Sequence, residues 1–253
     1  MSSKPAAAPP IPLSAARRAR LARCAAVADE DDAAFAAAGG GAAAPPAGWT
    51  RESDPCAGVA MFSRAMPGTG LRKYRATGPL PGAPRDAARL LWDADERMRW
   101  DATYAAIEQL GAVASDGDAG GVGAGGREDE IVLQRLCVRS VLVVSQRDFV
   151  CCHMRTDRAR DGVIRAVSYA ASEEDGLTPV DPAYVRGEVL EGSGWSVRPV
   201  AGPAGEQHAE MCYTVFLDLR GWIPHWVVNA AIGSTFAKYF SLLSSHLEAA
   251  SAD

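Results

Sequence analysis

The feature that most constrains the fold is the last part of the sequence, residues 224–249. Apolar residues recur there every three to four positions, as they do along one face of an α-helix. At about 1.5 Å per residue such a helix is about 40 Å long, enough to lie across a whole curved sheet. Lys238 and Glu248 are its only formal charges, so we expect it to be buried on several sides or to contact an apolar partner from time to time. The apolar positions are Trp226, Ala230, Gly233, Ala237, Phe240, Leu243 and Leu247.

Short strand patterns fill most of the chain before this helix. Because no helical pattern separates the later ones, the sheet must be largely antiparallel. Two other helices are predicted. One covers residues 84–100, and the other begins at the acidic residues 29–32 and ends at the glycines 39–41. We therefore predict an α+β fold in which a curved antiparallel sheet wraps around the C-terminal helix, with a core or a cavity between them. The predicted strands are 58–66, 71–77, 104–114, 131–144, 149–154, 163–170, 184–189, 195–200 and 211–219.

The composition excludes several classes of function. The 253 residues carry a formal charge of −5, and they lack the clustered cations that nucleic-acid binding requires. No stretch of about 20 apolar residues predicts a membrane span, and residues 1–13 lack the apolar core of a signal peptide. The six cysteines show no CxxC spacing, so we expect reduced thiols in a cytoplasmic protein.

Residues 1–27 are low in complexity and are predicted to be a disordered N-terminal arm, followed by one domain over residues 28–249. The Arg-rich stretch 15–23 has two readings: the end of an organelle-targeting peptide, or a solvated arm or short helix. The second is favoured because Ser is scarce and no cleavage context is clear.

A Gly-rich motif and the histidines add little chemistry. Residues 121–126 formally fit G-x-G-x-x-G, but a dinucleotide site needs a strand before the motif and a helix after it, and neither is predicted. The four histidines lack metal-site spacing, so no metal is predicted. Cys151 and His153 share a strand face. They form either a thiolate–imidazole pair or two satisfied polar groups in a pocket wall, and the lack of a third orienting group favours the latter.

Gln134 lies on an otherwise apolar strand face with Leu136 and Val138. A buried amide must be hydrogen-bonded to avoid a large cost. Either His153 on a neighbouring strand is its partner, or both polar groups contact the head group of an apolar ligand. The two readings are compatible, since a ligand can insert into a pair that satisfies itself when empty.

Four segments taken together resemble the START (steroidogenic acute regulatory protein-related lipid transfer) family. They are 145–150 (SQRDFV), 184–190 (YVRGEVL), 194–195 (GW) and 218–229 (DLRGWIPHWVVN), and the resemblance runs in order from about residue 29 to residue 247. It implies a helix-grip fold that encloses a tunnel for one lipid, with the C-terminal helix and nearby loops as a lid. It implies no cofactor and no catalytic residue.

The resemblance also implies roles for residues outside the tunnel. Leu142 and Val143 would lie at a loop tip that enters the membrane, with Trp222 as their interfacial partner. Arg147 and Asp148 would form a structural ion pair that orders the loop. Arg186, in the YVRGEVL segment, would be structural as well.

Within the tunnel, several sterol-binding members place an acid opposite an arginine. Those positions fall at Gln134 and His153 here, so the charged pair is absent and a neutral or pH-titratable polar spot remains. The residues predicted to contact lipid are Gln134, Leu136, Cys151, His153, Trp195, Phe236 and Phe240.

The predicted function is to bind one lipid and carry it between membranes, as a monomer that contacts the membrane surface transiently. A glycerophospholipid such as phosphatidylcholine is favoured, with sterol or ceramide as alternatives. Two other hypotheses stay open. One is an intrinsic hydrolase that uses Cys151 or a Ser with His153; the other is a lipid-gated interaction module that recruits a partner or an anionic membrane through Arg17 to Arg23.

Overall fold

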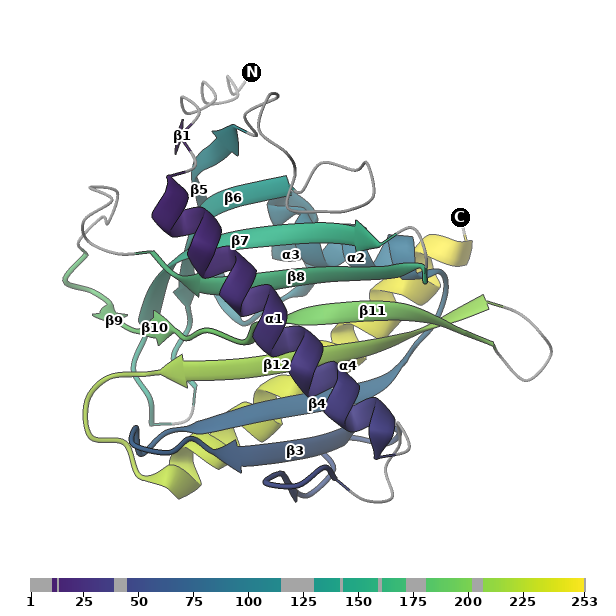
Figure 1. The fold of residues 1–253 in the computed structure, drawn as a ribbon, viewed down its shortest axis with the longest axis horizontal. Helices are drawn as coiled ribbons and strands as arrows, with labels where there is room; N and C mark the ends of the chain where they lie inside the picture. The colour runs from purple at the N-terminus through teal and green to yellow at the C-terminus, as the bar shows by residue number, and fades with distance from the viewer. Residues whose placement is uncertain are drawn as a thin grey trace.

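Figure 1 shows the computed structural model of the chain, which describes residues 11–12, 14–38, 45–114, 130–141, 143–158, 161–171, 181–201 and 207–252. The helices in these ranges are α1 (Ala15–Ala37), α2 (Pro84–Trp92), α3 (Ala94–Trp100) and α4 (His225–Ala252). The strands are β1 (Ile11–Pro12), β2 (Thr50–Arg51), β3 (Ala60–Ala65), β4 (Arg72–Leu80), β5 (Tyr104–Ala114), β6 (Glu130–Val138), β7 (Arg147–Arg158), β8 (Val163–Ala170), β9 (Val185–Arg186), β10 (Glu188–Val189), β11 (Ser193–Ala201) and β12 (Gln207–Asp218).

All of these strands belong to one sheet. Its order is β1-β5-β6-β7-β8-β11-β12-β4-β3-β2, with β9 paired to β7 and β10 paired to β12. The pairs are antiparallel except β1 with β5 and β7 with β9. In Figure 1, α1 crosses one face of the sheet, the outer face, and α4 lies behind the other, the inner face, with α2 and α3. The predicted antiparallel sheet with one long C-terminal helix, the helix-grip fold, is confirmed.

The main core lies between the inner face of the sheet and α2, α3 and α4. Alternate residues of each strand point inward, because successive side chains of a strand face opposite ways. Gly78 in β4 lies under α4, where an added Cβ would sit 2.8 Å from Val59 Cγ2 and 3.3 Å from the Phe240 ring. A glycine at this position therefore lets the helix pack directly on the strand. The residues of α4 that belong to this main core are Phe236, Tyr239, Phe240, Leu243 and Leu247.

Helix α1 on the outer face begins earlier than predicted. It starts at Ala15, where the Ser14 hydroxyl accepts a hydrogen bond from the Arg17 N–H at 3.2 Å and caps the helix. Leu21 and Cys24 are buried against β6, β7 and β8. Residues 15–27 are thus part of a packed helix and not of a disordered arm. The predicted helix start at Asp29 is wrong, because Leu21 and Cys24 pack on the sheet and stabilise the helical turns before Asp29.

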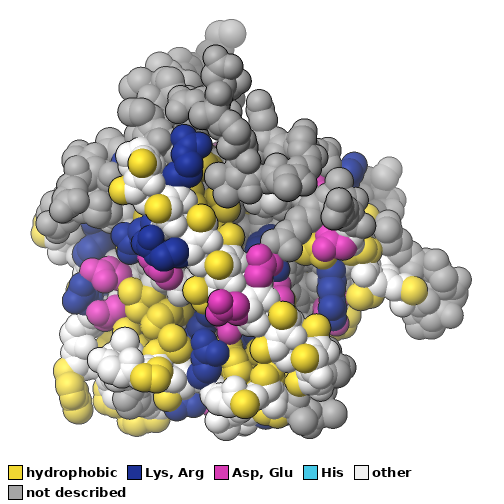
Figure 2. Space-filling view, viewed as in Figure 1, with side chains coloured by type: hydrophobic (Ala, Val, Ile, Leu, Met, Phe, Trp, Pro, Cys, Tyr) yellow, Lys and Arg dark blue, Asp and Glu magenta, His cyan; other side chains and the backbone are white. Residues whose placement is uncertain are grey.

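The acidic run instead lies in the middle of α1 and faces cations on the outer face. Asp31 pairs with Lys73, which is fully buried, and with Arg64 at 3.4 Å. Asp32 bridges Arg75, at 2.7 Å, and Arg165. Figure 2 shows Lys and Arg side chains next to Asp and Glu side chains across this face. The helix is therefore held by ion pairs along its second half as well as by apolar packing along its first.

Two further elements differ from the predicted bounds. The predicted helix 84–100 is interrupted at Asp93, which ends α2 and caps α3 by accepting from the Glu96 N–H at 2.9 Å. The predicted strand 131–144 ends at Val138.

No helix within the described ranges is long and apolar enough to cross a membrane.

Candidate functional site

A cavity of about 170 Å³ lies between the inner face of the sheet and the first turns of α4. Four of the residues predicted to contact lipid line it: Leu136, His153, Trp195 and Phe236. Most of the exposed area of the cavity wall is apolar, and the apolar residues include Val138, Val141, Val144, Phe149, Val189, Val215, Leu217, Leu219, Ala231 and Ile232. The wall also contains polar side chains, among them Arg97, Arg139 and Arg147.

The other three predicted residues lie beside the cavity and do not line it. The Gln134 Nε2 donates to Gln109 Oε1 at 3.2 Å. The prediction that His153 is the hydrogen-bond partner of Gln134 is therefore wrong. The register explains this, because Gln134 lies opposite Gln109 on β5, whereas His153 lies opposite Val132. Cys151 is buried in a cluster with Tyr104 and Phe149, and Phe240 belongs to the main core.

His153 is one of several polar side chains in the cavity wall. Its Nδ1 lies 2.7 Å from the Ser168 hydroxyl, and its Nε2 is buried without a hydrogen-bond partner among the described residues. Burial, with a smaller contribution from the positive charge of Arg97, lowers the pKa of His153 to about 3. The imidazole is therefore neutral at physiological pH and offers one nitrogen to a ligand.

The thiol next to it does not complete a reactive pair. Burial raises the pKa of Cys151 far above that of a free thiol, so the thiolate that a nucleophile requires does not form. A histidine whose pKa lies near 3 is also a weak base at neutral pH. A thiolate–imidazole pair is therefore disfavoured, and of the two residues only His153 lies in the cavity wall.

Arg97 is another polar residue of the cavity wall, and it was not among the residues predicted to contact lipid. Its Nε lies 3.3 Å from Asp101 Oδ2, its Nη2 donates to the Tyr104 hydroxyl at 2.9 Å, and its guanidinium carbon lies 4.8 Å and 5.5 Å from the centres of the Tyr104 and Tyr239 rings. Burial opposes the charge, but the tyrosines and Asp101 hold the pKa of Arg97 well above its ordinary value. The i, i+4 spacing of Arg97 and Asp101 at the end of a helix was the available signal.

The loop residues form a different network from the one expected. Arg147 and Asp148 are not an ion pair, because consecutive residues of β7 face opposite sides. Arg147 donates to the carbonyls of Ser145, at 2.6 Å, and Leu219, at 3.2 Å. Asp148 pairs with Arg135 and Arg186, each at 2.8 Å. Burial opposes ionisation of this carboxyl, but the hydrogen bonds from the two arginines hold the pKa of Asp148 below its usual value.

Several exposed apolar side chains lie close in sequence to residues that line the cavity. Val143 is 82% exposed between Val141 and Val144, which both line the cavity. Trp222 is 91% exposed just before α4, and Trp226 in the first turn of α4 is 70% exposed, although the helical stripe predicts it on the apolar face. Leu142, predicted to accompany Val143, lies outside the described residues. Isolated exposed apolar residues are ordinary, but two tryptophans and a valine beside a cavity suggest a contact surface.

No group of three or more His, Cys, Asp or Glu side chains within the described ranges is arranged to hold a metal ion. The part of the chain that the structure describes therefore offers a mainly apolar cavity with polar side chains in its wall.

The model of the START domain matches residues 41–252, most of the chain. Human StAR-related lipid transfer protein 5 superposes with a TM-score of 0.67 at 19% identity, covering 90% of this chain and 97% of that chain. A STAR-related lipid transfer protein from Xanthomonas axonopodis (fragment 25–204) gives 0.59 at 24% identity, covering 79% and 99%, and human STARD10 gives 0.62 at 18% identity, covering 87% and 79%. Curated proteins yield no significant match by sequence. The match to the family model, with the same fold in these structures, shows that the chain belongs to the START domain family.

Proposed function

We propose that this protein holds one lipid at a time in the cavity under α4 and carries it between membranes, contacting each membrane transiently as a monomer. The observation that supports this most is the composition of the cavity wall. It is apolar over most of its area, and its polar groups include Arg97, Arg139, Arg147 and the unpartnered Nε2 of His153. Such a wall suits a ligand with a polar head and an apolar body. Enclosing the body offsets about 0.8 kcal/mol per CH₂ of the cost of leaving a membrane.

The head group that suits this wall best is that of a glycerophospholipid such as phosphatidylcholine. Arg97 carries five N–H donors. Asp101 and Tyr104 accept from its Nε and Nη2, and Tyr213 is hydrogen-bonded to it as well, so we assign the remaining donors to a phosphate. A charge-assisted bond to phosphate is about twice as strong as a neutral one. The lining residues that the structure describes include Arg139 and Arg147 as well as Arg97, and no acidic side chain is among them, which favours a head group that carries a phosphate.

Sterol or ceramide is the alternative ligand class. A single hydroxyl would satisfy the Nε2 of His153, whose partner on the protein side is Ser168. It would leave the remaining donors of Arg97 unused. The role of Arg97 therefore discriminates between the two ligand classes.

Loading requires the cavity to expand. Its volume of about 170 Å³ is below the roughly 300–1,000 Å³ of ordinary ligand pockets. Ile232 and Phe236, in the first turns of α4, form part of the wall. We infer that these turns move outward, and that Val143, Trp222 and Trp226 stabilise the open form by inserting into a membrane surface, where tryptophan is favoured. Leu142 is proposed to act with them.

The two other hypotheses gain less support. A hydrolase would need a nucleophile and a base, and the pKa directions at Cys151 and His153 oppose both. An interaction module would need free arginines on α1. Arg17 is buried instead, and Arg20 and Arg23 both pair with Glu191, at 3.3 Å and 3.2 Å.

The experiment that tests the proposal is native mass spectrometry of the full chain after incubation with vesicles that contain phosphatidylcholine, ceramide and cholesterol. One lipid per chain is expected, and phosphatidylcholine should predominate. The variant Arg97→Gln should lose phosphatidylcholine selectively. Arg99→Gln is the matched control, since Arg99 lies on the exposed side of the same helix and pairs only at the surface.

Circular dichroism verifies that Arg97→Gln folds, and Arg97→Lys, which keeps the charge, should retain part of the loading. Phosphatidylcholine uptake that is equal in Arg97→Gln and Arg99→Gln would reject the phosphate assignment. No uptake of any lipid by the unmodified chain would reject the proposed function itself.

A further inference from the structure

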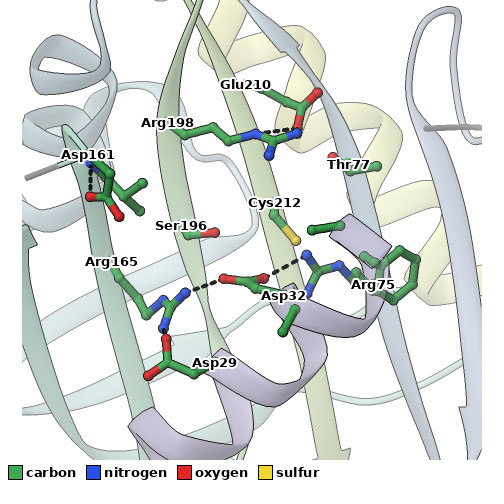
Figure 3. A pocket seen from close by; sticks show the side chains of 14 residues that line it. Asp29, Asp32, Arg75, Thr77, Asp161, Arg165, Ser196, Arg198, Glu210 and Cys212 are labelled. Carbon is green, nitrogen blue, oxygen red and sulfur yellow. Dashed lines mark hydrogen bonds and ion pairs between the residues drawn. The ribbon is translucent and has the colours of Figure 1, made fainter. Parts of the chain in front are cut away.

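A second hollow lies on the outer face of the sheet, beside the second half of α1 (Figure 3). Its volume is about 290 Å³, larger than the lipid cavity at about 170 Å³. The sheet separates the two sites, because adjacent residues of β11 face opposite ways. Trp195 lines the lipid cavity, whereas Ser196 lines the outer hollow. The proposed lipid transfer makes no use of this second site.

Small side chains in three neighbouring strands form the floor of the hollow. Ser196 in β11 lies opposite Cys212 in β12, and Cys212 lies opposite Thr77 in β4. With strands about 4.8 Å apart, this row is about 10 Å long. The short side chains leave the space that longer ones would fill, and they present two hydroxyl groups to it.

Two buried arginines form one wall. Arg75 is 6% exposed and Arg165 is 7% exposed, and Asp32 of α1 bridges them, with Arg75 Nη2 at 2.7 Å from one carboxylate oxygen. The Nε atoms of both arginines are buried without a hydrogen-bond partner among the described residues. Figure 3 shows this pair with Asp32 below the floor residues Ser196 and Cys212. The two Nε atoms have almost no accessible surface, so what the wall offers a ligand is its arginine–carboxylate pairs. Such pairs favour a ligand whose groups both accept and donate hydrogen bonds.

The charges of the hollow argue against an ionic ligand. Its lining holds three arginines and four acids, and each arginine is already paired with an acid. Arg198 completes the set by donating to Glu210 at 2.8 Å, across the hollow from Asp32 (Figure 3). An anion would face the surplus of carboxylates, and a strong cation would compete with the arginines for the same acids.

We propose that this outer hollow binds a small uncharged polyhydroxylated molecule of the monosaccharide or cyclitol class. A hydroxyl group accepts and donates at once, so neighbouring hydroxyls can accept from arginine N–H groups and donate to Glu210 or Asp161. Ser196 and Thr77 can do both on the floor. The volume is near the lower end of the range for ligand pockets, about 300 Å³, which suits a single ring.

The test uses the full chain, loaded with phosphatidylcholine, and four probes. They are myo-inositol and D-glucose, with ethanolamine as a cation and inorganic phosphate as an anion. Binding is followed by amide NMR shifts and by calorimetry at about 0.05 M and about 0.5 M salt. At least one polyol should shift amides of β4, β11 and β12. Its affinity should change less than about twofold with salt, because screening acts on charges.

The double variant Thr77→Val with Ser196→Ala removes two hydroxyls and no charge. It should weaken polyol binding about tenfold or more, as expected for two lost hydrogen bonds. Ser241→Ala, which removes a hydroxyl from the exposed side of α4, is the matched control and should bind normally. Phosphatidylcholine loading and the melting temperature verify that both variants fold.

Three results would overturn the proposal. They are the absence of binding by both polyols, binding of ethanolamine or phosphate at the floor with a strong dependence on salt, and polyol binding that survives in the double variant. None of them bears on the lipid cavity, which lies on the other face of the sheet.

Discussion

One of the ion pairs that hold α1 on the sheet is buried, and its removal should be costly in a way that depends on pH. Lys73 is 0% exposed at its side chain and its partner Asp31 is 5% exposed. Burial lowers the pKa of Lys73, and the charge and hydrogen bond of Asp31 act in the opposite direction. The variant Asp31→Asn keeps the size of the side chain and removes the charge that stabilises the ammonium group.

The expected loss is about 3–5 kcal/mol of the free energy of unfolding at pH 7, the usual cost of leaving one buried charge unpaired. The cost of removing the proton from Lys73 sets an independent upper limit on this loss of stability. Taking a proton from a group with a reference pKa of about 10.4 at pH 7 costs roughly 5 kcal/mol, at about 1.4 kcal/mol per pH unit. The penalty cannot greatly exceed this value, since Lys73 would lose its proton instead.

The sign of the pH dependence follows from proton counting. In the variant, the pKa of Lys73 in the folded state falls further below its value in the unfolded chain. The unfolded state then binds more protons at neutral pH, so stability rises as the pH increases toward 10. If the folded variant carries a neutral Lys73, the stability difference from the unmodified protein should shrink by about 1.4 kcal/mol for each pH unit between 7 and 9.

Urea unfolding followed by circular dichroism at pH 7, 8 and 9 measures this difference. Glu30→Gln, at an exposed position of the same helix, is the matched control and should cost less than about 0.5 kcal/mol. Asp31→Asn combined with Lys73→Met should recover much of the lost stability. A loss below about 1 kcal/mol at pH 7, or a loss that is equal at all three pH values, would refute the buried ion pair as a contributor to the attachment.

Four further predictions concern the lipid site and its support. Trp222→Ala combined with Trp226→Ala should slow phosphatidylcholine transfer between vesicles while equilibrium loading is retained; equal loss of both would mean that these residues serve packing alone. Because the pKa of His153 is about 3, lipid retention should stay constant from pH 8 to pH 5, and a midpoint near 6.5 in native mass spectra would contradict this. The same lowered pKa means that stability falls as the pH drops below about 6.5, by up to about 1.4 kcal/mol per unit, and His153→Gln should reduce this slope in urea titrations. Gly78→Ala should lower stability by about 1–3 kcal/mol in thermal unfolding, since its Cβ would meet Val59 at 2.8 Å; an unchanged melting temperature would show that α4 can shift without cost.

Within the candidate site, the sequence predicted correctly those residues whose position depends only on which face of a strand or helix they occupy. Leu136, Trp195 and Phe236 line the cavity as their strand and helix faces require. It failed for Gln134, whose partner depends on the register between β5 and β6, and the bulge in that pair cannot be derived from periodicity. It also paired Arg147 with Asp148, although strand alternation by itself excludes that contact.

The sequence by itself determined the type of each major element, because helical and strand periodicities are local properties of the chain. The lack of helices between the late strands likewise determined an antiparallel sheet with one long helix. Only the tertiary structure decided which distant groups meet. Arg97 on α3 reaches the cavity beside His153 on β7, and α1 begins at Ala15 because the outer face of the sheet buries its first turns. Trp226 is exposed although it lies in an apolar stripe. Such contacts join residues far apart in the chain, and they follow from packing, register and burial.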